Sequence, residues 1–271
     1  MGQSGRYELK YVVDEERARA VARHVQSYLR PSTHNGARGH PVISLYLDSP
    51  DFFFFRQGFG GHKNRIKLRI RFYDDEWKRP AFLEIKRRVG DVICKDRAMI
   101  SREGVRQFLN GGWPCPTYWP EASVLAHGKR RLGVYNMFWS LANRVRARGV
   151  IYVSYLREIF ETPDDEELRV TLDREIRATL YDGSGRLHVP SRGVPPPPDK
   201  PPSYLSRDSV VVELKFDDRA PTWMYDMVRR FDLQRRPLCK YCTLIDGFGL
   251  QWGNRLSPEQ EIPLSLAAAL A

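Results

Sequence analysis

Apolar and basic residues alternate without a break in Ile66-Lys67-Leu68-Arg69-Ile70-Arg71-Phe72. Successive side chains of a β-strand point to opposite faces, so this alternation predicts a strand with one apolar and one basic face. The same period of two recurs along most of the chain. It predicts strands at about Arg6–Val13, Val42–Leu47, Asn64–Tyr73, Ala81–Arg88, Asp91–Ile100, Val150–Glu161, Leu168–Glu175 and Ser209–Phe216, with a short ninth segment near Lys240–Ile245.

Helical periodicity occurs in segments between the strands. Asp14 and Ser101 are placed as N-caps, Gly111 and Gly112 end the second helix, and Pro221 is placed at the first helical position of the last. We expect helices at Asp14–Leu29, Ser101–Asn110, Arg131–Arg148 and Pro221–Phe231.

Most predicted strands carry their charged residues on a single face. A solvated antiparallel sheet is the ordinary explanation for such a face, but a flat sheet would gain little from the repulsion between so many bases. A barrel that turns this face inward would concentrate the field on an anionic ligand, and helices could cover its apolar outside. We therefore favour a barrel whose lumen includes Lys10, Arg69, Arg71, Lys86, Lys95, Arg97, Arg157, Arg169 and Lys215.

The overall charge also predicts an anionic partner. The 271 residues include 44 Lys and Arg against 33 Asp and Glu, a formal net charge of +11. Nucleic acid, a membrane surface and a phosphorylated molecule would each suit this excess. Nucleic acid is disfavoured because the bases lie at strand parity and no recognition motif occurs. Phe52–Phe55 could stack bases, but it is more simply a buried turn and helix start.

Targeting signals and cysteine chemistry give mostly negative expectations. The N-terminus runs directly into a charged strand, and no apolar run approaches the ~20 residues of a membrane span, so we expect a cytoplasmic protein without one. Cys239-Lys-Tyr-Cys242 has the spacing of a redox pair or of half a zinc site. A zinc site needs about four ligands and no second pair of suitable spacing occurs, so we expect two half-buried thiols on a strand.

The strands before and after the Pro195–Pro198 run share one charge pattern. This similarity predicts a long proline-rich loop near 190–208 within one domain, rather than a linker between two. We expect a single domain over residues 1–250, followed by a C-terminal tail at 251–271.

Carboxylates among the lumenal bases suggest a metal. Glu8, Glu84, Asp173 and Glu213 would repel a run of phosphates unless a cation lay between them. Magnesium and manganese are oxygen-seeking ions that bridge carboxylates and phosphates. Alternatively each acid only pairs with a neighbouring Lys or Arg, and for Glu84 and Asp173 that explanation carries at least equal weight.

Eight motifs follow one another in order between Arg6 and Gly247. They are Arg6-Tyr-Glu-Leu-Lys10-Tyr, Ser44-Leu-Tyr-Leu-Asp48-Ser-Pro50-Asp, Lys67-Leu-Arg69-Ile-Arg71-Phe-Tyr, Leu83-Glu-Ile-Lys86-Arg, Val153-Ser-Tyr155-Leu-Arg157-Glu, Leu168-Arg169-Val-Thr-Leu-Asp173, Val212-Glu213-Leu-Lys215-Phe and Pro237-Leu-Cys-Lys240-Tyr. Together they resemble the VTC domain of polyphosphate polymerases, within the triphosphate tunnel enzymes. The resemblance implies an α+β fold, an eight-stranded antiparallel tunnel barrel with flanking helices. It further implies a metal-dependent phosphotransferase that moves the γ-phosphoryl of ATP or another nucleoside triphosphate to a polyphosphate chain in the tunnel.

The resemblance also implies roles for individual residues. Tyr155 would donate a hydrogen bond to the polyphosphate, and Glu213 would hold Mn²⁺ or Mg²⁺. Arg97, Lys215 and Glu8 share the tunnel parity and are expected to complete the site. The phosphate ligands would be Lys10, Arg69, Arg71, Lys86, Lys95, Arg157, Arg169 and Lys240.

Other activities of the same tunnel remain open. Tunnel triphosphatases open with two glutamates in an ExExK strand, whereas this chain has Arg6 before Glu8 and Lys10. The basic residue counts against hydrolysis of triphosphate or of a nucleoside triphosphate. A non-catalytic polyphosphate-binding module would need the same bases and is the remaining alternative.

Overall fold

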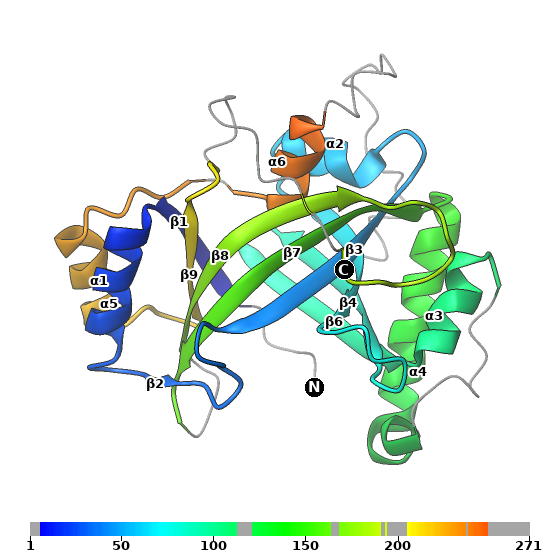
Figure 1. Cartoon of the computed structure of the whole chain (residues 1–271), viewed down its shortest axis with the longest axis horizontal. Helices are drawn as coiled ribbons and strands as arrows, with labels where there is room; N and C mark the ends of the chain where they lie inside the picture. Colours follow the sequence, from blue (N-terminus) through cyan, green and yellow to red (C-terminus); the bar gives the residue numbers. More distant parts are fainter. Residues whose placement is uncertain are drawn as a thin grey trace.

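Eight long antiparallel strands form one sheet that curls around a cavity (Figure 1). The structure, a computed structural model, describes residues 6–112, 121–163, 168–190, 193, 205–236 and 238–248. The long strands are β1 Tyr7–Val13, β3 His40–Asp48, β4 Arg65–Phe72, β5 Ala81–Val89, β6 Val92–Ile100, β7 Arg148–Glu161, β8 Arg169–Leu180 and β9 Val210–Phe216.

The strand order is β1-β9-β8-β7-β3-β4-β5-β6, and the short β2 (Arg30–Pro31) pairs with β7 beside this path. The two end strands meet at a bridge between Arg6 and Ile93, where each backbone N–H donates to the other residue's carbonyl at 3.1 Å. The predicted fold class is therefore confirmed: an α+β protein with an eight-stranded antiparallel barrel and flanking helices. This bridge holds the seam between β1 and β6.

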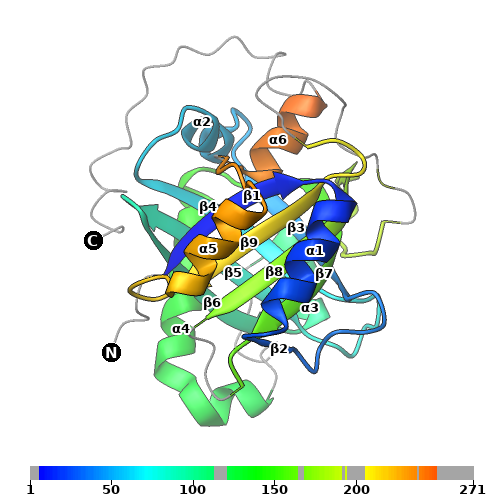
Figure 2. The same cartoon turned by 90° about the vertical axis from the view of Figure 1, so that its left-hand side faces the viewer.

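Helices cover the outside and one end of the barrel (Figures 1 and 2). One pair packs over β8 and β9, a second pair lies against β5 and β6, and a third pair lies at one end of the barrel. In that order the pairs are α1 Glu15–Val25 with α5 Thr222–Arg230, α3 Arg102–Leu109 with α4 Glu121–Arg144, and α2 Phe53–Phe59 with α6 Lys240–Gly247.

The apolar parity of each strand faces these helices, as the alternation predicted. Leu68, Ile70 and Phe72 of β4 are fully buried with Phe138 of α4 in one cluster. Burying a side chain of this size stabilises the fold by about 1.5–3 kcal/mol relative to leaving it in water. Because the apolar side chains of each strand point outward against helices, the charged side chains between them point into the barrel.

The N-caps of two helices agree with the prediction. The Asp14 side chain accepts a hydrogen bond from the Arg17 amide at 2.7 Å, and the Ser101 hydroxyl accepts one from the Gly104 amide at 3.1 Å. Pro221 is a correction, because it is extended and is itself the N-cap of α5 rather than the first helical residue. The predicted helix start within Phe52–Phe55 is confirmed by α2.

The predicted ninth strand at Lys240–Ile245 is wrong, because this segment is the helix α6. The Cys239 sulfur accepts a hydrogen bond from the Cys242 amide at 3.2 Å and caps the helix. Tyr241 and Leu244, at helical spacing, are buried at the end of the barrel. Short apolar runs fit either structure, and here burial against the barrel end decides for the helix.

The strand β8 continues past its predicted end at Glu175 to Leu180, and it contains a bulge at Glu175. Glu175 has a φ of 50°, and the pairing with β7 shifts register between Ser154 and Leu156. Beyond it, Ile176 lies with the apolar residues at the closed end of the barrel. The extra residue changes which parity faces inward.

Two predicted segments fall outside the described residues, namely Val194–Pro202 of the proline-rich loop and the tail at 251–271. Within the described ranges, no helix combines the length and the apolar composition needed to cross a bilayer.

Candidate functional site

The barrel encloses a cavity of about 1760 Å³ whose lining is strongly basic. Seventeen Lys and Arg line it against five Asp and Glu. Such an excess inside low-dielectric walls focuses a positive field on the space between the strands. Every residue predicted for the site lines this cavity: Glu8, Lys10, Arg69, Arg71, Lys86, Lys95, Arg97, Tyr155, Arg157, Arg169, Glu213, Lys215 and Lys240. The placement of the strand residues agrees with their parity, whereas Lys240 enters the cavity from α6; the roles of all of them remain predictions.

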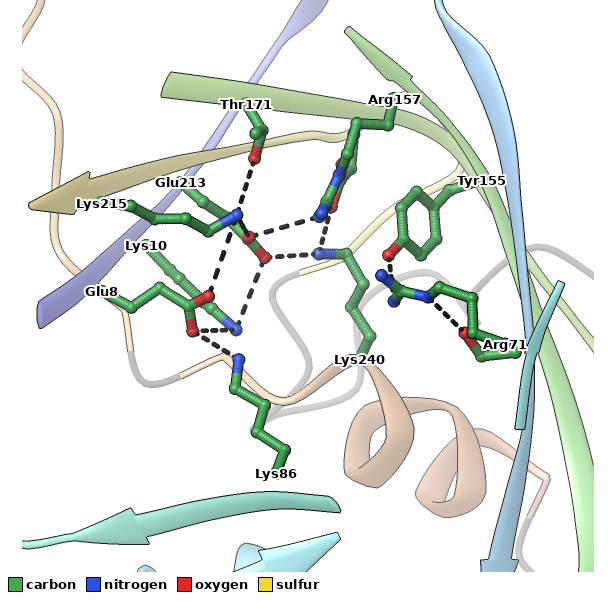
Figure 3. Close-up of polar contacts among 12 residues, drawn as sticks. Glu8, Lys10, Arg71, Lys86, Tyr155, Arg157, Thr171, Glu213, Lys215 and Lys240 are labelled. Carbon is green, nitrogen blue, oxygen red and sulfur yellow. Dashed lines mark hydrogen bonds and ion pairs between the residues drawn. The ribbon is translucent and has the colours of Figure 1, made fainter. Parts of the chain in front are cut away.

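Glu213 lies at the centre of the densest group of charges (Figure 3). The ammonium nitrogens of Lys215 and Lys240 are each 2.9 Å from its carboxylate, a guanidinium nitrogen of Arg157 is at 3.3 Å, and the ammonium nitrogen of Lys10 is at 3.5 Å. Burial alone would raise the pKa of Glu213, but these cations, led by Lys215, hold it well below its usual range. The carboxylate is therefore ionised and organises four bases around one point.

Asp173 fixes the orientation of Arg157. It is fully buried and accepts two hydrogen bonds from the Arg157 guanidinium, at 2.6 and 2.7 Å, while Lys240 lies 2.6 Å away. Such a bidentate pair holds the guanidinium in one geometry. The contacts favour the ion-pair interpretation of Asp173 over a direct role with metal or phosphate.

Glu84, on β5, fixes bases of the neighbouring strands β4 and β6 in the same way. It is fully buried, 2.7 Å from Arg69 and within 3.7 Å of Arg71, Arg97 and Lys95. Burial would raise the pKa of Glu84, yet Arg71 and the other bases hold it well below its usual range. Glu84 thus holds three predicted phosphate ligands, Arg69, Arg71 and Lys95, together with Arg97.

Three lysines face one another across β4, β5 and β6, and among the described residues only Lys86 and Lys95 have an acid nearby, Glu8 at 2.7 Å and Glu84 at 3.7 Å. Lys67 pairs across the sheet with Lys86, which pairs in turn with Lys95. Like charges directly opposite each other on a sheet destabilise it. Burial lowers the pKa of Lys86 to about 7 and that of Lys95 to about 8. A bound anion would relieve this cost.

Tyr155 lies between the two groups of bases. Its hydroxyl accepts a hydrogen bond from Arg71 at 3.2 Å, and its ring lies 5.1 Å from both the Arg157 guanidinium and the Lys240 ammonium. The phenol is only 6% exposed, so the two cations over its ring are held by a buried, fixed platform.

Several tunnel bases were missed by the sequence prediction. Lys67 shares the parity of Arg69 and Arg71, and that signal alone could have included it. The alternation along a strand cannot predict which bases of loops or strand ends reach the cavity. The missed lining bases are Arg6, Arg65, Lys67, Arg79, Arg88, Arg235 and Arg236.

The carboxylates Glu8 and Glu213 form the part of the tunnel that suits a metal. Glu8 lies 2.7 Å from Lys86 and shares Lys10 and Lys215 with Glu213. Magnesium is usually held by one or two carboxylates together with substrate phosphates. Among the described residues no three His, Cys, Asp or Glu side chains cluster as a complete metal site. The pair therefore fits a metal that takes its remaining ligands from phosphate.

The chain matches the model of the VTC domain over residues 5–247 and belongs to this family. It is 22% identical over 237 residues to the vacuolar transporter chaperone complex subunit 4 of Schizosaccharomyces pombe, covering 80% of this chain and 32% of that protein. The chain thus spans about a third of the length of this relative. A crystal structure from Bacillus halodurans, described as a candidate adenylate cyclase, superposes with a TM-score of 0.46 at 14% identity, over 88% of this chain and 96% of that one.

Proposed function

We propose that the protein is a polyphosphate polymerase, which transfers the γ-phosphoryl of ATP or another nucleoside triphosphate to a polyphosphate chain lying in the tunnel. The observation that carries the proposal is the row Lys67–Lys86–Lys95, in which like charges oppose each other across neighbouring strands. Glu8 and Glu84 compensate only part of this repulsion, and a bound polyanion would offset the remainder. Membership of the VTC domain family and the basic cavity support the same substrate class.

Phosphoryl transfer needs positioning and charge neutralisation more than covalent help from the protein. The tunnel offers both, because Glu84 and Asp173 hold the guanidinium groups of Arg69 and Arg157 before any ligand arrives. Preorganised donors of this kind contribute roughly 2–4 kcal/mol each to transition-state stabilisation. The remaining predicted bases would bind the bridging and terminal phosphate oxygens along the chain.

In this proposal Glu213, with Glu8 beside it, would hold Mn²⁺ or Mg²⁺. The ion would neutralise charge on the phosphate oxygens that it contacts. In the structure the four bases around Glu213 compensate the charge of its carboxylate. A phosphate that binds together with a metal would contact the same four bases.

Arg6 argues against the triphosphatase alternative. It makes an ion pair with Asp217 at 2.5 Å and forms the backbone bridge to β6. It therefore helps to close the barrel, at the position where a tunnel triphosphatase would place a second carboxylate beside Glu8. A cytoplasmic location and one domain over residues 1–250 remain predictions.

A single assay separates the three activities. Purified protein is incubated with ATP and Mn²⁺ or Mg²⁺, and polyphosphate, ADP and free phosphate are followed separately. We expect ADP to appear together with polymer. ADP with free phosphate alone would mean hydrolysis, and tripolyphosphate binding without ADP would mean a binding module.

Two arginines of β8 provide a matched pair of variants for this assay. Arg169→Gln removes a base from the tunnel lining, whereas Arg177→Gln changes an exposed residue of the same strand. We expect polymer formation to fall by about 10²- to 10³-fold in the first variant only. Equal activity of the two variants would contradict the tunnel as the site.

A further inference from the structure

A pair of cysteines stands at the wall of the tunnel, at the start of α6. The Cys239 sulfur lines the cavity and lies 2.8 Å from the Lys67 ammonium. The Cys242 sulfur is 2.7 Å from it, and both thiols are free. The predicted location on a strand was wrong, and the helical geometry is what brings the two sulfur atoms together.

The two thiols differ in environment. Cys239 reaches the tunnel, accepts a hydrogen bond from the Cys242 amide at the helix N-terminus, and faces a cation. Burial would raise the pKa of Cys239, but Cys242 and Lys67 bring it well below its usual value. The hydrogen bond with Cys239 and then burial raise the pKa of Cys242. An accessible thiolate with a buried thiol partner is the arrangement of dithiol redox pairs.

The packing around Cys242 keeps the pair together. A Cβ atom added to Gly58 of α2 would lie 2.5 Å from the Cys242 sulfur, so only glycine permits this close approach. A disulfide bond is about 2.05 Å long, so closing it from the observed separation requires a movement of less than about 1 Å.

We propose that Cys239 and Cys242 are a redox-active pair, and that their oxidation to a disulfide releases Lys67 to bind the anion in the tunnel. The proposal rests on the proposed function only in taking the tunnel as the anion site. The Cys239 thiolate would attack a small-molecule disulfide, forming a mixed disulfide and releasing one thiolate. Cys242 would then give its proton to a leaving thiolate and attack the Cys239 sulfur, so that the two cysteines lose two electrons and the oxidant gains them.

Oxidation of Cys239 would change the charge next to Lys67, the first lysine of the row Lys67–Lys86–Lys95. In the reduced state the Cys239 thiolate neutralises Lys67. Burial would lower the pKa of Lys67, but the neighbouring Cys239 raises it above its usual value, so the ammonium stays charged and paired with the thiolate. A disulfide sulfur is neutral, so oxidation adds one net positive charge to the cavity. We expect the dissociation constant for tripolyphosphate to fall by roughly three- to tenfold, given partial screening in a water-filled tunnel.

The test uses the full chain carrying Cys94→Ser and Cys115→Ser, so that only this pair titrates. The protein is equilibrated with reduced and oxidised glutathione at a series of ratios, and the free thiols are counted by alkylation and mass spectrometry. Binding of inorganic tripolyphosphate is measured by calorimetry on each form. We expect an intramolecular disulfide and tighter binding by the oxidised form.

The variants separate the disulfide from its effect on binding. Lys67→Gln removes a cation that holds Cys239 ionised, so it should still form the disulfide but show a smaller difference in tripolyphosphate affinity between the two states. Lys63→Gln, at an exposed lysine outside the tunnel lining, should keep the full redox effect. Cys242→Ser should abolish both. No disulfide at any ratio, or a disulfide without a change in affinity, would overturn the proposal. Absence of tripolyphosphate binding in both states would refute the tunnel as the anion site and the coupling with it, while the thiol count would still report the disulfide.

Discussion

Buried acids give the individual bases of this tunnel their fixed positions. Glu84, Asp173 and Glu213 are at most 4% exposed, and each contacts two or more Lys or Arg side chains. The bases are therefore arranged before a ligand binds, which lowers the entropy that binding must offset. Of the three, Glu213 is the one whose predicted role as a metal ligand can be separated from an ion-pair role by substitution.

Glu213→Gln removes the charge of the carboxylate and keeps its size. If Glu213 is a metal ligand, we expect the Mn²⁺ concentration for half-maximal turnover to rise by roughly 10- to 100-fold. Metal-free binding of tripolyphosphate should strengthen, because four bases lose an opposing charge.

Glu161→Gln is the control for this variant, since Glu161 also lines the tunnel and pairs with Arg169 at 2.7 Å. Its metal dependence should match that of the unmodified protein. If Glu213→Gln instead lowers the melting temperature and leaves the metal dependence unchanged, the carboxylate is structural and the metal prediction is wrong.

The lowered pKa of Lys95 predicts how anion binding in the tunnel depends on pH. Burial lowers its pKa from 10.5 to about 8, with Arg71, Arg97 and Arg69 adding to the effect and Glu84 opposing it. The free tunnel therefore loses a charge as the pH rises through 8, and a bound anion favours regaining it. Tripolyphosphate affinity should decrease above pH 8, and binding near pH 8 should take up protons.

Calorimetry in two buffers of different ionisation enthalpy measures this proton uptake. Lys95→Arg keeps the charge at all these pH values, so proton uptake near pH 8 should diminish while binding persists. Unchanged uptake in this variant would show that another group titrates.

At the scale of elements, Asp48 joins β3, α2 and α6. Its carboxylate accepts hydrogen bonds from the amides of Ser49, Phe54 and Phe55 at 2.8 Å and from the Tyr241 hydroxyl at 2.6 Å. Tyr241 also stacks on Tyr46, whose hydroxyl accepts from Arg69 at 3.1 Å. One buried carboxylate thus connects the two helices at the end of the barrel with a base of the tunnel.

Removing the hydroxyl of Tyr241 should therefore destabilise the protein. We expect Tyr241→Phe to lower the free energy of unfolding by about 1–3 kcal/mol, because a buried carboxylate oxygen loses a donor. Urea denaturation measures the change, and Tyr225→Phe, at a tyrosine that is 53% exposed on α5, is the control. Equal midpoints for the two variants would mean that the Asp48–Tyr241 contact contributes nothing.

The long strands were predictable from the sequence and α6 was not, and α4 runs over Glu121–Arg144 rather than within the predicted Arg131–Arg148. In β4 and its neighbours a strict period of two fixed both the strand and the inward face, because each face meets a different environment over many residues. The segment after Cys239 is too short for either period to dominate, and its structure depends on the barrel end that it covers. Arg235 and Arg236 were missed for a related reason: they reach the tunnel because their loop runs along β1, where the Arg236 amide donates to the Lys10 carbonyl at 3.1 Å.

For the molecule as a whole, the barrel is closed by one weak junction, the bridge between Arg6 and Ile93, which we call the clasp. Neighbouring strands elsewhere in the barrel share ladders of five or more residue pairs, whereas β1 and β6 meet at the Arg6–Ile93 bridge. The clasp therefore has far fewer hydrogen bonds to break than any other junction between the eight long strands. We expect the amide protons of Arg6 and Ile93 to exchange with solvent well before those of Leu68 and Ile70, in native-state hydrogen exchange followed by NMR. Equal protection at the clasp and in the middle of β4 would mean that the ring opens nowhere in particular, and that its strands come apart only when the whole protein unfolds.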